Sequence, residues 1–323
     1  MFSDQLKNIK INGRYLCKDN YLYFYNVGSG ISVLSKDTKI TITLSFLNNS
    51  GYIYIIKNKE YNLKEKVFID KETELVISVN QPDTQIDICK ANEALDNTLV
   101  IKDIIGDFKK PQDSKCNIKI YGDSTIAGYG ILGKYGDEIS LHMSDGVEDF
   151  CFDALYSLDC DFNIFAASGW GLIFSSYTTP KTIGIIDKCS FVSVTNSEVW
   201  KDDKKNDLLI ISLGTNDYSF IKENAEIRAE LFDRYFQAYE KLILQERNDN
   251  KNLPVLMVYG TLNESECYEL NEYTFNVLKE KYNFIYLHKF NGNASAISNH
   301  AYITAHKKMK KELEICIKQI LKI

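Results

Sequence analysis

The feature of this sequence that most constrains its fold is a change of pattern near residue 110. Before it, short runs rich in β-branched and aromatic residues recur between turn signals such as "GSG" and "NQPDT". The run "KITITLSF" alternates apolar and polar side chains with period two, which indicates a half-buried strand. Turns at roughly eight- to twelve-residue spacing predict an all-β sandwich. After residue 117, apolar strands alternate with amphipathic helical segments, which predicts a parallel sheet covered on both faces.

The pattern predicts two domains, 1–110 and 111–323, joined by the polar segment "IIGDFKKPQDSKCN". The strands that we expect in the first domain are 21–27, 30–35, 39–46, 51–57, 66–70, 73–79, 84–89 and 98–104. In the second domain we expect strands at 117–121, 162–166, 207–214, 254–260 and 284–288, and helices at 147–159, 223–245, 266–282 and 301–322.

Composition and charge narrow the functional classes. The formal net charge of −6 and the pI near 5.4 argue against nucleic acid or an anionic membrane as a partner, since both require clustered Lys and Arg. We find neither the apolar core of a signal peptide nor a run of eighteen apolar residues. The eight cysteines, Cys116 and Cys160 among them, are scattered singly. We therefore expect free thiols and a cytoplasmic protein.

The stretch "IKIYGDSTIAGYGILG", residues 118–133, places a glycine-rich turn after the first strand of the second domain. Such a turn can hold phosphates, and Gly128–Gly133 matches GxGxxG. However, a dinucleotide-binding loop puts its first glycine directly after the strand, whereas six residues separate Tyr121 from Gly128. A P-loop needs a hydroxyl after its lysine, where this chain has Tyr135. The sequence therefore disfavours nucleotide binding.

The same stretch offers a serine nucleophile, Ser124, just beyond the end of a strand. Acyl transfer also needs a base and donors for the oxyanion. Because the carboxyl ends of parallel strands meet at one edge, Gly169 in "FAASGWGL" and Asn216 in "GTNDYSF" should lie near Ser124. His300 in "SNHAYITAH" precedes the last helix on the same side. The GxSxG pattern of ordinary α/β-hydrolases is absent.

These blocks, Gly122–Ser124, Gly169, Gly214–Asp217 and His300, resemble in their order the four blocks of the SGNH (GDSL-type) hydrolases. An all-β domain before them is similar to the second carbohydrate esterase family, whose members remove O-acetyl groups from plant polysaccharides. The segments "NGRYL" and "YNVGSGISVLSKDTKITITL" resemble that family's first strands, so the resemblance covers nearly the whole chain. It implies an N-terminal jelly-roll sandwich and a C-terminal α/β/α hydrolase domain with a five-stranded parallel sheet.

The resemblance also implies the role of each block. Ser124 is the nucleophile and His300 the general base and then acid, while the Ser124 N–H, the Gly169 N–H and the Asn216 side chain form the oxyanion hole. Gly171 is the alternative to Gly169. The pattern departs from the family at Ser298, which occupies the position of its catalytic acid. Some members use a Ser–His dyad oriented by a backbone carbonyl, and we expect that arrangement here.

Aromatic and acidic residues adjoin these blocks. Trp170 and Tyr218, with Tyr129, could stack on a sugar ring or pack in the core, and we assign Trp170 and Tyr218 to substrate binding. Asp123 is expected to accept hydrogen bonds from its own turn. Asp217 is expected to accept hydrogen bonds from the Asn216 loop.

The remaining histidines are expected to have other roles. His306 should pack on the last helix, and His142 should be exposed in a polar loop. His288 ends a strand and is a weaker candidate for the base. No His, Cys or carboxylate cluster has the spacing of metal ligands, so we expect neither metal nor cofactor.

The sequence thus predicts a serine esterase that removes O-acetyl groups from poly- or oligosaccharides of the acetyl xylan or acetyl mannan type. Its partner would be the acetylated carbohydrate. An esterase acting on lipids or small acyl esters is a second hypothesis, because SGNH proteins differ widely in substrate. A non-catalytic carbohydrate-binding protein with a decayed hydrolase domain is a third, motivated by the missing acid.

Overall fold

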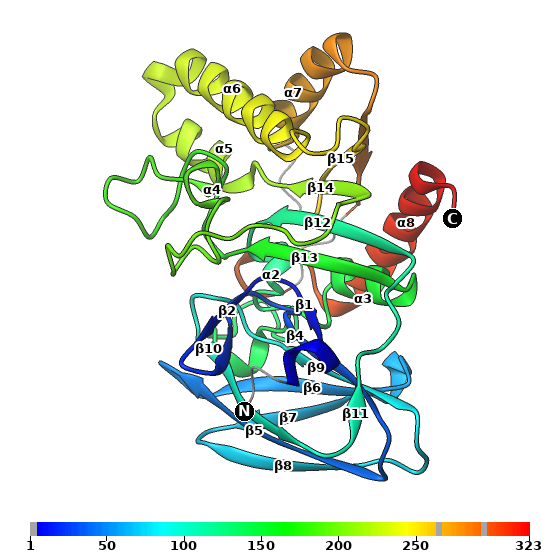
Figure 1. Ribbon diagram of the computed structural model, residues 1–323. Helices are drawn as coiled ribbons and strands as arrows, with labels where there is room; N and C mark the ends of the chain where they lie inside the picture. Colours follow the sequence, from blue (N-terminus) through cyan, green and yellow to red (C-terminus); the bar gives the residue numbers. More distant parts are fainter. Residues whose placement is uncertain (1–4, 263–266, 292–295) are drawn as a thin grey trace.

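The first part of the chain is a sandwich of two antiparallel sheets (Figure 1). The computed structural model describes residues 5–262, 267–291 and 296–323. One sheet has the strand order β1-β4-β9-β6-β7, with β11 pairing to β4, and the other has the order β2-β3-β10-β5-β8. The bounds are β1 Lys10–Asn12, β2 Tyr15–Lys18, β3 Tyr21–Phe24, β4 Gly30–Ser35, β5 Lys39–Leu47, β6 Gly51–Lys57, β7 Glu65–Ile69, β8 Thr73–Ser78, β9 Thr84–Lys90, β10 Thr98–Ile105 and β11 Phe108–Lys109.

The path of strands β3 to β10 through the two sheets is that of a jelly roll. These strands form the four-stranded orders β4-β9-β6-β7 and β3-β10-β5-β8, the interleaved arrangement that two Greek keys produce. Alternation with period two creates the core: Ile40, Ile42 and Leu44 of β5 are fully buried between the sheets. The predicted jelly-roll sandwich is confirmed, because each expected strand of this domain is present.

Three short strands were not predicted from the periodicity of the sequence. Strands β1 and β2 have three and four residues, too short for a periodic pattern to be visible. Strand β11 lies inside the segment that we predicted to be a linker, and Phe108 pairs with Ser35 of β4. Since β11 ends at Lys109 and the next strand begins at Cys116, we place the domain boundary between them.

The second part of the chain contains a parallel sheet with the order β13-β12-β14-β15-β16. Its five strands confirm the predicted α/β/α architecture. Their bounds are β12 Cys116–Gly122, β13 Cys160–Ala166, β14 Leu208–Ser212, β15 Val255–Tyr259 and β16 Ile285–Lys289. The helices are α2 Ser124–Ala127, α3 Phe150–Ser157, α4 Ile185–Lys188, α5 Thr215–Glu223, α6 Arg228–Glu246, α7 Cys267–Lys281 and α8 Ile303–Leu321; short 3₁₀ turns occupy η1 Leu6–Asn8, η2 Tyr61–Leu63, η3 Leu141–Met143, η4 Ala225–Ile227 and η5 Ile297–Asn299.

Helices cover both faces of this sheet (Figure 1). Alternate residues of each strand point to opposite faces, so Ile118 and Ile120 of β12 pack with α3 and α8. Tyr121 of the same strand, with Leu209 and Ile211 of β14, packs with α6 and α7 on the other face. The expected helix 223–245 corresponds to α6, which begins later, at Arg228. The preceding α5 was not expected and ends before Asn224, whose φ of −123° and ψ of 51° are not helical.

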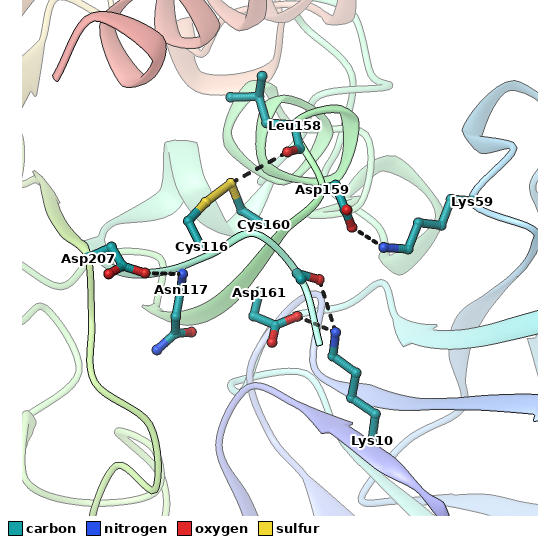
Figure 2. Close-up of a disulfide and its surroundings, with 10 residues drawn as sticks. Lys10, Lys59, Cys116, Asn117, Leu158, Asp159, Cys160, Asp161 and Asp207 are labelled. Carbon is teal, nitrogen blue, oxygen red and sulfur yellow. Dashed lines mark hydrogen bonds and ion pairs between the residues drawn. A yellow bond between two sulfur atoms is a disulfide. The ribbon is translucent and has the colours of Figure 1, made fainter. Parts of the chain in front are cut away.

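Two cysteines depart from the prediction of free thiols. Cys116 and Cys160, the first residues of β12 and β13, are paired in register and form a disulfide (Figure 2). Forty-four positions separate them in the sequence, so only the parallel pairing of the strands makes them neighbours. The ion pair between Lys10 and Asp161 lies beside the disulfide. Among the described residues, no helix combines the length and hydropathy needed to cross a membrane.

The two domains share a buried interface. Arg14, between β1 and β2, is fully buried. Its guanidinium donates to the side chain of Asn163 on β13 at 3.1 Å and to the Tyr121 hydroxyl at 3.2 Å. Asn26 donates to the carbonyl of Val192 at 2.9 Å. The sandwich is therefore bonded to the sheet of the second domain by paired polar groups as well as apolar contacts.

Candidate active site

Ser124 is the first residue of α2, directly beyond the carboxyl end of β12. Asp123 caps this helix, since its carboxylate accepts a hydrogen bond from the Thr125 N–H at 3.0 Å. Gly122 has no space for a side chain, because a Cβ there would lie 2.4 Å from Ile126. Burial raises the pKa of the Asp123 carboxyl to about 6. The turn thus presents Ser124 at the sheet edge, and Asp123 has the acceptor role expected of it.

The base candidate reaches this serine from the far end of the sequence. The Nε2 atom of His300 lies 2.7 Å from the Oγ atom of Ser124. The Nδ1 atom lies 3.1 Å from the carbonyl oxygens of both Ile297 and Ser298. Because carbonyl oxygens only accept hydrogen bonds, these contacts place the proton on Nδ1 and a lone pair on Nε2. This is the tautomer that accepts a proton from serine.

An unusual backbone turn supplies these two carbonyls. Ser298 and Asn299 have φ values of 51° and 61°, in the left-handed region that L-residues with side chains seldom adopt. The His300 N–H closes the turn by donating to the Ile297 carbonyl at 3.0 Å. Strained conformations persist where the surroundings determine them, often at functional sites. Here the turn aims carbonyls rather than the Ser298 side chain at His300.

The glycine-rich stretch after Ser124 packs against this histidine turn. A Cβ on Gly130 or Gly133 would lie 3.0 Å or 2.4 Å from the Ile297 side chain, so both glycines permit close approach. The Gly130 N–H donates to the Ser144 hydroxyl at 3.1 Å, and the Gly133 N–H donates to the Gly130 carbonyl at 3.0 Å. Amides that are already bonded within the loop do not form a phosphate cradle. The glycines instead let this stretch pack against Ile297 in the turn before His300.

The turn after β13, at the same edge of the parallel sheet as Ser124, contains Gly169 and Gly171. Gly169 has a φ of 71°, and its N–H donates to no residue within the part of the chain that the structure describes. In contrast, the Gly171 N–H donates to the Phe174 carbonyl at 2.8 Å. Of the two glycines left open by the sequence, Gly169 is therefore the one with an available amide.

The block Gly214–Asp217 is hydrogen-bonded to the loop that contains Gly169. Asn216 is the second residue of α5, and its amide nitrogen donates to the Trp170 carbonyl at 3.1 Å. Asp217 is fully buried and accepts from the Leu172 and Ile173 N–H groups, each at 2.8 Å. We had expected Asp217 to stabilise the Asn216 loop. It stabilises the loop after Gly169 instead. Burial raises the pKa of its carboxyl to about 7.

Comparison with known proteins identifies this architecture. Neither a protein-family model nor a curated protein matches the sequence, whereas solved structures match over nearly its whole length. A family two carbohydrate esterase from Cellvibrio japonicus has a TM-score of 0.82 at 16% identity, covering 98% of this chain and 96% of that chain. The chain has the fold of the family 2 carbohydrate esterases.

Two further structures with this fold extend the comparison. A family two carbohydrate esterase from Clostridium thermocellum in complex with cellohexaose has a TM-score of 0.82 at 18% identity, and the match covers 97% of this chain and 99% of that chain. An acetyl xylan esterase from the rumen bacterium Butyrivibrio proteoclasticus has a TM-score of 0.82 at 16% identity. The match covers 98% of this chain and 96% of that chain. At such identities the likeness establishes the fold alone.

The two aromatic residues assigned to substrate binding are in the core. Trp170 and Tyr218 are only 3% and 7% exposed and pack in the apolar cluster on the α6 face of the sheet. A ring that is buried offers no face to a sugar, so the stacking role assigned to both is wrong in this structure. Tyr177 is 63% exposed and its ring lies over Gly169, while Tyr129 lies 5.0 Å from the His300 ring. No sequence pattern distinguished Tyr177.

The other histidines lie outside this site. His306 is buried, and its Nδ1 accepts from the Phe150 N–H at 3.2 Å; burial lowers its pKa to about 3, which agrees with the packing role. His288 lies 2.9 Å from Glu312, and His142 is exposed, as expected. Among the described residues, no group of His, Cys, Asp or Glu side chains is arranged to hold a metal ion.

Sequence reasoning missed one acidic residue at this site. Glu93, in the jelly-roll domain, accepts a hydrogen bond from the Ser168 N–H at 2.7 Å. Ser168 immediately precedes Gly169. A single glutamate in a loop between two strands carries no signal in the sequence, because only the packing of the domains brings it to Ser168.

Proposed function

We propose that this protein is a serine esterase that removes O-acetyl groups from poly- or oligosaccharides of the acetyl xylan or acetyl mannan type. The observation that carries the proposal is the 2.7 Å contact between the Ser124 Oγ and the His300 Nε2. A serine bonded to the unprotonated nitrogen of an imidazole is activated for attack on an ester.

In the first half of the proposed reaction, His300 takes the proton of Ser124 while Oγ attacks the acetyl carbonyl carbon. The tetrahedral intermediate collapses as His300 gives that proton to the departing sugar oxygen, leaving an acetyl group on Ser124. In the second half, His300 deprotonates a water molecule that attacks the acetyl-enzyme. Acetate leaves, and the proton returns to Ser124.

The proposed orienting groups for the base are the carbonyls of Ile297 and Ser298. They accept from Nδ1 at 3.1 Å, so they hold the ring and favour the imidazolium that forms during attack. These contacts support the Ser–His dyad oriented by backbone carbonyls that the resemblance implied. Ser298 contributes its main chain, which accounts for a serine in the position of the family's acid.

The proposed oxyanion hole contains three donors: the N–H of Ser124 and Gly169, and the side-chain amide of Asn216. One hydrogen of the Asn216 amide is bonded to the Trp170 carbonyl, which leaves its second hydrogen for the oxyanion. Donors held in place before the reaction stabilise developing charge without reorganisation.

The proposed substrate class rests on the proteins that share this fold. One of them is described in complex with cellohexaose and another as an acetyl xylan esterase. The decisive experiment measures acetate release from acetylated xylan and acetylated glucomannan beside hydrolysis of a long-chain acyl ester. We expect acetate from a polysaccharide and none with Ser124→Ala. Preferred cleavage of the long-chain ester would favour a lipid esterase, and polysaccharide binding without acetate release would favour a non-catalytic protein.

A further inference from the structure

A loop of the jelly-roll domain packs against the turn of the second domain that contains Ser168 and Gly169. Residues 91–97 connect β9 to β10, and Ala94 of this loop packs in the same apolar cluster as Trp170. Glu93 is only 4% exposed, and its Oε2 accepts from the Ser168 N–H at 2.7 Å. A glutamate of one domain thus contacts the residue before the Gly169 donor of the other.

The Glu93 main chain is held by its own domain. The ammonium of Lys90 is fully buried and donates to the main-chain carbonyls of Asn92 and of Glu93, the latter at 3.0 Å. The Asp96 N–H donates to the same Glu93 carbonyl at 3.3 Å. Acidic side chains are rarely buried without paired partners, because desolvation of the charge is costly. Here the buried carboxyl accepts from the main-chain N–H of Ser168, the residue before Gly169.

Hydrogen bonds hold the main chain on both sides of the Gly169 amide. Before it, the Ser168 N–H is held by Glu93. After it, the Gly169 carbonyl accepts from the Ser176 N–H at 3.0 Å. A misplacement of about 1 Å at a reacting centre can reduce the rate roughly 100-fold, so a bond that fixes this peptide influences catalysis without touching substrate.

We propose that Glu93 is a positioning residue of the oxyanion hole, through which the jelly-roll domain holds the Gly169 amide toward the acetyl carbonyl oxygen. This inference rests on the proposed esterase function and deepens it. It makes the first domain a structural part of the active site in addition to any role in binding glycans.

Steady-state kinetics with two variants and a control test the proposal. Glu93→Ala should lower kcat roughly 10- to 100-fold and change KM less than about threefold. Glu93→Gln retains an oxygen that accepts from Ser168, so it should keep kcat within about threefold of wild type. Asn26→Ala is the matched control, because it removes another buried bond between the domains, to Val192; it should leave kcat unchanged. A Glu93→Ala enzyme with wild-type kcat, or an equal loss of kcat in Asn26→Ala, overturns the proposal.

Amide hydrogen exchange separates this inference from the proposed function. Glu93→Ala should accelerate exchange across residues 167–171, whereas Asn26→Ala should not, and this measurement does not depend on turnover. If wild-type protein fails to hydrolyse acetyl esters but the exchange result holds, the esterase assignment fails and the positioning contact stands. Unchanged exchange at residues 167–171 in folded Glu93→Ala protein refutes the positioning role, whatever the activity.

Discussion

The Oγ atom of Ser124 and the Nε2 atom of His300 lie 2.7 Å apart although 176 positions separate the two residues in the chain. The serine follows the first strand of the parallel sheet and the histidine precedes the last helix. The sheet edge brings them together, and the turn at Ser298 and Asn299 aims the imidazole at the serine.

Removal of the proposed nucleophile should abolish turnover. We expect Ser124→Ala to lower kcat by several orders of magnitude while the protein remains folded, because the serine and its base act as one unit. Mass spectrometry of wild-type protein during turnover should detect an acetyl group on Ser124. The control is Ser157→Ala at the exposed end of α3, which should be fully active. More than a few per cent of residual activity in folded Ser124→Ala would show that another group is the nucleophile.

Loss of Asn216, the proposed side-chain oxyanion donor, should destabilise the transition state of the proposed reaction. Asn216→Ala should reduce kcat roughly 100- to 1,000-fold with a smaller change in KM, as found for comparable donors. Asn224→Ala, a matched change at the far end of α5 that removes a bond to the Phe220 carbonyl, should retain activity. A rise in KM alone for Asn216→Ala would indicate a substrate-binding residue instead.

The turn before His300 should tolerate side-chain loss but not a change of backbone. Ser298→Ala should keep activity within about tenfold, because the Ser298 carbonyl and not its exposed side chain contacts Nδ1. Asn299→Val should be far more damaging, since a β-branched residue opposes a φ of 61°. Measured kcat values check both. A thousandfold loss in Ser298→Ala would contradict the orientation of His300 by main-chain carbonyls.

Asp217 should make stability depend on pH. Burial raises the pKa of its carboxyl from 3.8 to about 7, so between these values the folded protein holds a proton that the unfolded chain releases. The contribution of the Asp217 carboxyl to the free energy of unfolding is fully present below pH 3.8 and is lost as the pH rises through about 7. The unfolding free energy of wild type should therefore fall relative to Asp217→Asn by roughly 1–4 kcal/mol between pH 4 and pH 7. Denaturant titrations check this; parallel pH curves for the two proteins would contradict it.

The Cys116–Cys160 disulfide should contribute to stability. Replacement of both cysteines by alanine should cost roughly 2–4 kcal/mol, because the disulfide restricts the unfolded chain. Thiol titration of denatured protein should find two more thiols after reduction than before it. An equal thiol count in both conditions would mean that the pair is reduced in the isolated protein.

Local pattern was sufficient to predict most of the fold. The period-two alternation of β5 and the apolar runs of β12 and β14 are patterns of residues adjacent in the sequence. They therefore predict which side chains of these strands are buried. Ser124, Gly169 and Asn216 each follow such a strand, and the geometry of parallel sheets places all strand ends at one edge. The candidate site could therefore be predicted as a set of residues at that edge.

Contacts between distant segments were decided by the tertiary structure alone. The sequence could not show that Ile297 packs on Gly130 and Gly133, that Trp170 turns its ring into the core, or that Cys116 meets Cys160. The same holds for Glu93, which acquires its partner only when the jelly roll docks on the turn at Ser168. Each of these facts depends on which side chains meet across the packed layers, and no periodicity within a single element encodes that choice.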